Sequence, residues 1–106
     1  MRETFAALVA RHQATAARDP EVRAMMSRIA PDEARHAALA WRVDAWARAR
    51  SSRKTRARIA GARERATLDL IRAARRAVPR QLVVELGLPA ADQATALASA
   101  LFSALA

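Results

Sequence analysis

The chain of 106 residues contains no cysteine, only two glycines and few aromatic side chains, which make up 4% of the sequence. Because cysteine is absent, disulfide bonds, zinc sites built from thiolates and cysteine nucleophiles are excluded. Alanine and arginine dominate the composition, and β-branched residues are scarce. This composition predicts an all-α protein, and the length suits one small domain with a modest core.

The net charge of +9 is concentrated in one part of the chain. Residues 51–80 contain ten arginine or lysine residues against Glu64 and Asp69, whereas residues 81–106 contain two acids and no basic residue. A basic segment binds nucleic acid or an acidic surface in some proteins, but more often it is a solvated face. The sequence has no apolar run typical of a signal peptide or a membrane span, so we expect a cytoplasmic protein.

The first fifty residues predict two helices joined by a very short turn. The first helix should cover residues 3–18. Residues 19–21 read Asp-Pro-Glu, which is a strong start signal, with aspartate as the N-cap, proline at the first helical position and an acid in the first turn. The second helix should then cover residues 20–50, with a kink at Pro31 because proline interrupts the hydrogen-bond ladder. Such a short turn predicts an antiparallel hairpin.

Three further helices are expected after a break at Ser51 and Ser52. Gly87 suits the left-handed position that follows a helix, and Pro89 suits the first position of the next one. The expected ranges are 55–77, 79–86 and 89–105. The predicted organisation is thus a long-helix hairpin over residues 1–50, with a basic helix and two C-terminal helices over residues 51–106 packing on it as a single compact domain.

Glu33 and His36 stand three residues apart in the middle of the second helix. On a helical wheel, both fall inside an apolar stripe that should face the core. That stripe consists of Val22, Met25, Ile29, Ala40, Val43 and Ala47. A charged carboxylate on a core-facing stripe is costly unless it is paired. An inward-facing Glu-x-x-His pair is also how helical bundles present ligands to a di-iron or di-manganese centre.

A third candidate ligand follows from the expected register of the hairpin. Glu3 lies sixteen residues before Asp19, and Glu33 lies fourteen residues after it. At about 1.5 Å of rise per residue, the two carboxylates should stand at nearly the same height above the turn. We therefore expect Glu3, Glu33 and His36 to converge on one point between the helices.

Residues 1–50, with Asp-Glu-Ala-Arg-His-Ala-Ala-Leu-Ala-Trp at their centre, resemble the second helix pair of the ferritin and rubrerythrin (ferritin-like) superfamily. Glu3 matches the lone glutamate of that half, and Glu33 and His36 match its Glu-x-x-His. The separation of thirty residues between the two glutamates also agrees with this family. The chain resembles encapsulated ferritins too, in which one such helix pair completes its site across a dimer. The tail is similar to the sequence after this domain in some bacterial ferritin-like proteins.

The resemblance implies half of a four-helix bundle and half of a carboxylate-bridged di-iron site. Glu3, Glu33 and His36 would be the metal ligands, with iron or manganese favoured and zinc a further option. Asp32 would orient the imidazole of His36 from outside the ligand set. Because a complete ferritin-like chain has two such ligand sets, a homo-oligomer or a missing upstream half should supply the rest. The implied activity is that of a ferroxidase or oxidase.

Two alternative functions remain open at this level. Lys54, Arg58, Arg65, Arg72 and Arg76 form a narrow basic stripe on the third expected helix. That stripe suggests a protein that associates with nucleic acid through charge and without sequence specificity. No aromatic residue or zinc-finger motif supports sequence-specific reading of bases. The other alternative is a metal-free helical interaction module.

Overall fold

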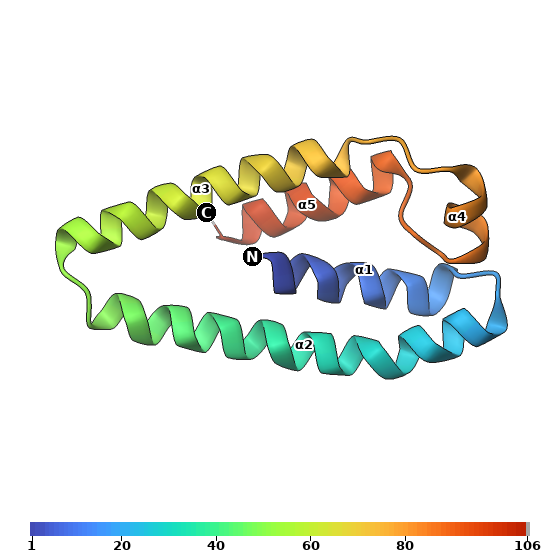
Figure 1. Cartoon of the computed structure of the whole chain (residues 1–106), viewed down its shortest axis with the longest axis horizontal. Helices are drawn as coiled ribbons and strands as arrows, with labels where there is room; N and C mark the ends of the chain where they lie inside the picture. The colour runs from blue at the N-terminus through green and yellow to red at the C-terminus, as the bar shows by residue number, and fades with distance from the viewer. Residues whose placement is uncertain (106) are drawn as a thin grey trace.

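Five helices account for most of residues 1–105, which are the residues that this computed structural model describes. Their bounds are α1 Arg2–Ala16, α2 Pro20–Ala49, α3 Arg53–Ala74, α4 Arg80–Glu85 and α5 Ala91–Leu105. The all-α class predicted from composition is confirmed. The molecule measures 49 × 26 × 16 Å, and α1 lies between α2 and α5 (Figure 1).

The helix starts follow the capping residues of the sequence. The carboxylate of Asp19 accepts hydrogen bonds from the backbone N–H groups of Glu21 at 2.9 Å and Val22 at 3.4 Å, and Pro20 occupies the first turn of α2. Ser52 accepts a hydrogen bond from the N–H of Thr55 at 3.2 Å and thereby starts α3. These side chains satisfy N–H groups that the helix itself leaves without partners.

Several helix ends differ from the expected ones. α3 ends at Ala74 rather than at residue 77. Pro79 lies shortly after this end, and the proline disfavours helical geometry at the preceding residue, Val78. The last helix was expected from Pro89, but α5 begins at Ala91. The side chain of Gln93 accepts a hydrogen bond from the N–H of Ala90 at 3.0 Å and acts as the N-terminal cap. By contrast, α2 continues as one helix through Pro31.

The core is small and consists mainly of alanine. Its most buried apolar residues are Ala10, Ala17, Ala37, Ala74, Ala94, Ala98 and Leu101. Phe5, Leu70 and Ile71 pack around Ala74 at the end of α3 and the alanines Ala94 and Ala98 of α5. The radius of gyration is 15.5 Å, against about 13 Å for a globular domain of this length. The chain is therefore an elongated bundle with little interior.

Gly87 joins the C-terminal helices to the α1–α2 turn. Its φ of +68° is left-handed, as the sequence predicted, and a Cβ at this position would lie 2.4 Å from the backbone nitrogen of Ala17. The carbonyls of Val84 and Glu85 accept hydrogen bonds from the N–H groups of Arg18 at 2.9 Å and Asp19 at 3.2 Å. This close approach places α4 beside the turn that joins α1 to α2 (Figure 1).

Gly87→Ala should therefore destabilise the fold. The left-handed conformation alone costs a residue with a Cβ about 1–2 kcal/mol, and the overlap with Ala17 adds to that cost. Urea unfolding followed by circular dichroism would measure the loss. Gly61→Ala is the matched control, because the new Cβ would meet only the end of the Arg65 side chain at 3.5 Å. That variant should gain about 0.5–1 kcal/mol of stability. Equal stability of the two variants would contradict the requirement for glycine at position 87.

Candidate functional site

Glu33 and His36 lie one turn apart on α2, on the same side of the helix. Glu33 is half-buried and His36 is exposed. Neither faces a closed core, although the sequence placed both on a core-facing stripe. The pair therefore presents one carboxylate and one imidazole at the surface of a long, continuous helix.

Glu3 occupies the first turn of α1, and its carboxylate is 53% exposed. The N-terminal ammonium of Met1 lies 3.7 Å from one of its oxygens. An ion pair of this exposure contributes at most about 1 kcal/mol, because water screens it. The carboxylate is thus held weakly and remains accessible to solvent.

The register of the hairpin differs from the expected one. The indole N–H of Trp41 donates a hydrogen bond of 2.7 Å to the hydroxyl of Thr4, so the start of α1 lies beside Trp41. Met1 shares a surface hollow with Ala40 and Trp41. Those residues are at least seven positions beyond Glu33, which corresponds to about 10 Å along the helix. Glu3 and Glu33 consequently do not stand at the same height.

The turn between the helices explains this offset. Ala17 and Asp19 have extended backbones, with ψ angles of 129° and 119°. The extended residues carry the start of α2 past the end of α1, as the right-hand end of the hairpin shows (Figure 1). Within residues 1–105, no three histidine, aspartate or glutamate side chains come together in a group that could hold a metal ion. One chain therefore does not gather Glu3, Glu33 and His36 at one point.

Asp32 has a different partner from the one expected. Its carboxylate is paired with the guanidinium of Arg35, one turn along α2, instead of with the imidazole of His36. Both side chains of this pair are largely exposed. The carboxylate of Asp32 is therefore engaged by Arg35 rather than by His36.

The surface of α2 around His36 is apolar and uncovered. Leu39, Val43 and Trp46 are 53%, 56% and 58% exposed, and Met25 on the same side is 50% exposed. The guanidinium of Arg50 lies 4.6 Å from the ring centre of Trp46. We call the surface formed by Met25, Ile29, His36, Leu39, Val43 and Trp46 the α2 face. The sequence identified much of this stripe but assigned it to the core.

The α2 face is exposed because α2 has few neighbouring helices. It packs mainly against α1, which has 15 residues to cover the 30 of α2, while α5 packs on α1 and α3. Ala37, on the side toward α1, is the buried residue of α2. The apolar stripe next to it is left to solvent.

An ionic contact that the sequence did not reveal links α3 to α2. The guanidinium of Arg63 lies 2.6 Å from a carboxylate oxygen of Asp44 and 5.1 Å from the ring centre of Trp41. Arg48 also contacts Asp44, at 3.0 Å. Only the tertiary fold brings these residues together, since Arg63 and Asp44 are 19 positions apart. They hold the middle of α3 against α2.

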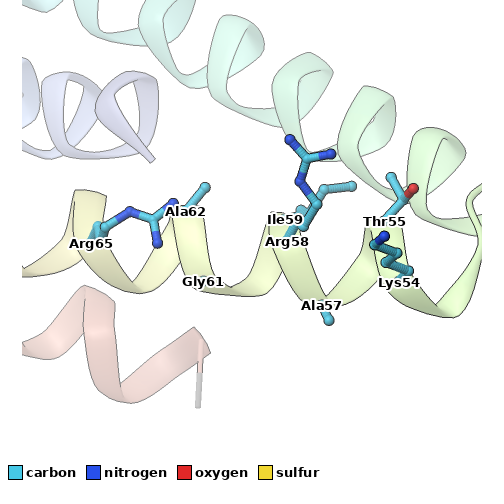
Figure 2. A pocket seen from close by; sticks show the side chains of 8 residues that line it. All are labelled: Lys54, Thr55, Ala57, Arg58, Ile59, Gly61, Ala62 and Arg65. Atoms are coloured by element: carbon cyan, nitrogen blue, oxygen red, sulfur yellow. The ribbon is translucent and has the colours of Figure 1, made fainter.

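The predicted basic stripe is partly realised on α3. Lys54, Arg58 and Arg65 are exposed and line a surface hollow of about 780 Å³ (Figure 2). Arg72 continues the line but lies 3.8 Å from Asp69, with which it forms an exposed ion pair. Arg76 does not continue it, because α3 ends at Ala74.

Comparison of the chain with protein-family models, with curated proteins and with solved structures yields no match. None of the helices within residues 1–105 combines the length and the apolar character that crossing a membrane requires. The α2 face and the basic line of α3 are therefore the two surfaces from which a function can be inferred.

Trp41→Phe and Thr4→Val should each destabilise the protein by about 0.5–1.5 kcal/mol, because each removes the half-buried hydrogen bond that sets the hairpin register. Combined, the two substitutions should cost less than the sum of the single losses, since the second has no hydrogen bond left to break. A double-mutant cycle by urea unfolding measures this coupling. Strict additivity would show that the indole and the hydroxyl do not interact.

Proposed function

We propose that the chain is a ferritin-like metal-binding protein that supplies half of a di-iron or di-manganese carboxylate site and completes it with a second copy of itself. The observation that carries the proposal is that Glu33 and His36 lie together on α2, beside apolar side chains that the rest of the described chain leaves exposed. A metal site that needs a second chain would have its ligands on such a surface.

The donor chemistry of the pair fits the proposed metals. A hard carboxylate with an imidazole suits iron or manganese, and zinc is also compatible. At positions i and i+3, His36 would bind one metal while Glu33 bridges to the next, as in helical di-iron bundles. Glu3 would add its weakly held carboxylate from the start of α1. Bound iron would supply the redox chemistry of a ferroxidase or oxidase.

The spacing of apolar residues on the α2 face supports a two-fold pairing of two α2 helices. Ile29 and Val43 lie seven positions before and after His36, and Met25 and Trp46 lie eleven before and ten after it. In an antiparallel pair centred on His36, Ile29 of one copy would meet Val43 of the other, and Met25 would lie one position from Trp46, as an isologous interface requires. The same pairing would bring two Glu-x-x-His sets within about one helical turn of each other.

Burial energetics favour the same assembly. Covering one exposed leucine or valine side chain contributes about 1.5–3 kcal/mol when burial is complete. The α2 face offers four large side chains that are at least half exposed, Met25, Leu39, Val43 and Trp46. A bundle with so little interior of its own would gain a substantial core from a second copy.

The second candidate is a metal-free helical interaction module. It is supported by the large apolar side chains of the α2 face, four of which are at least half exposed. In this alternative the α2 face would bind another helix through the same apolar residues, and Glu33 and His36 would be solvated polar positions of the interface.

Metal content tests the first candidate. After reconstitution with iron or manganese, the wild type should retain about one metal per chain, as half of a dinuclear site implies. Glu33→Gln and His36→Gln should each lose most of it, while the matched control Glu64→Gln on exposed α3 keeps it. Elemental analysis after gel filtration gives the ratio. A wild type that associates without retaining metal would support the interaction module and contradict the metal site.

Disruption of the α2 face tests the second copy. Val43→Lys should convert a dimer to a monomer and remove bound metal at the same time, because a charge would be buried between the copies. Leu68→Lys is the control, since Leu68 on α3 is 50% exposed and lies outside the face. Light scattering coupled to gel filtration measures the mass. A wild type that is monomeric at every concentration tested would contradict pairing through the α2 face.

A further inference from the structure

The first half of α3 projects from the bundle with little covering it. The central alanines of α5, Ala94 and Ala98, pack with Ala74 at the far end of α3, and Ile71 packs against them. Every residue from Arg53 to Arg58 is exposed. In Figure 1 this stretch leaves the bundle toward the α2–α3 loop, away from α5. Packing within the chain therefore does not account for the side chains along it.

Three positive charges lie in line on this stretch. Lys54, Arg58 and Arg65 are separated by four and seven positions, which returns to the same side of a helix after one and two turns. Gly61 lies between Arg58 and Arg65 and has no side chain, so the hollow that these residues line stays open (Figure 2). The three cations border a concave, accessible strip about 16 Å long at 1.5 Å per residue.

Carboxylates do not neutralise this strip. Asp44 is engaged by Arg63 and Arg48, and Asp69 is engaged by Arg72. In the described part of the chain, Lys54, Arg58 and Arg65 take part in no ion pair at all. The segment of highest positive charge density thus retains its charge for an external partner.

We propose that the line formed by Lys54, Arg58 and Arg65 binds the phosphate backbone of a nucleic-acid duplex, without reading its sequence. A duplex carries one phosphate per 3.4 Å of axial rise on each strand, so a strip of about 16 Å covers a rise of four to five base pairs and the phosphates that border it. Arg72, one further step along the same line, extends the contact once it exchanges Asp69 for a phosphate. This inference is independent of metal binding, because it uses none of Glu3, Glu33 and His36.

The surroundings of the line favour a duplex over an anionic membrane. A helix that lies in a membrane interface buries an apolar face beside its charges. The apolar side of the second half of α3 packs on α5 through Ile71 and Ala74, and Ala57 and Gly61 between the cations are small. Leu68 is the only large apolar side chain of α3 that the described structure leaves strongly exposed. A single leucine is a weak anchor.

The test is the binding of a labelled 20-base-pair DNA duplex of arbitrary sequence to the full chain, followed by fluorescence anisotropy at several salt concentrations. The wild type should bind with an affinity that falls steeply with salt. The variant Lys54→Gln/Arg58→Gln/Arg65→Gln should bind at least about tenfold more weakly at low salt, and the slope of log K against log salt should decrease by about three, one for each lost phosphate contact. Glutamine retains helix propensity, and circular dichroism verifies the fold of each variant.

The matched control is Arg11→Gln/Arg28→Gln/Arg42→Gln, which removes the same charge from exposed positions of α1 and α2. It should lose less than about threefold in affinity and keep most of the wild-type salt slope. Equal losses in the two triple variants would overturn the proposal, because binding would then reflect only the net charge of +9. Tighter binding of the wild type to vesicles containing phosphatidylserine than to the duplex would also overturn it.

Discussion

The architecture depends on one close backbone contact, between Gly87 and the turn that joins α1 to α2. A Cβ at position 87 would lie 2.4 Å from the nitrogen of Ala17, so only glycine permits this approach. Two backbone hydrogen bonds from Arg18 and Asp19 close the junction, and the amide of Gln13 adds a third bond to the carbonyl of Leu86 at 3.0 Å. Because the alanine core is thin, these polar contacts add to the packing of Phe5 on the α3–α5 core in tying the C-terminal helices to the hairpin.

With the C-terminal helices held on the α1 side, α2 packs along one side only. Its buried contacts use small residues such as Ala37, while its larger apolar side chains remain at the surface. Burying these side chains against another helix would lower the free energy, because it removes apolar surface from water. In the proposed dimer, His36 would lie at the centre of this surface, so the second copy would cover the apolar side chains and supply the other metal ligands.

The charges divide into two groups with different consequences. Asp44 gathers Arg48 and Arg63 at a half-buried contact between α2 and α3, where partial exclusion of water strengthens the attraction. Lys54 and Arg58 lie in the first half of α3 and Arg65 just beyond its middle, and no carboxylate of the described residues pairs with them. The middle of α3 therefore stabilises the fold through an ion pair with α2, while its first half presents a positively charged surface to solvent.

The sequence by itself determined the helical class, the capping of α2 by Asp19 and the left-handed turn at Gly87, because each follows from local backbone chemistry. It also determined that Glu33 and His36 share one side of a helix, since that follows from helical periodicity alone. Only the tertiary structure decided which side of α2 is covered and where Glu3 lies along it. Those outcomes depend on the extended turn and on contacts such as Thr4 with Trp41, which join residues 37 positions apart and leave no periodic signal in the sequence.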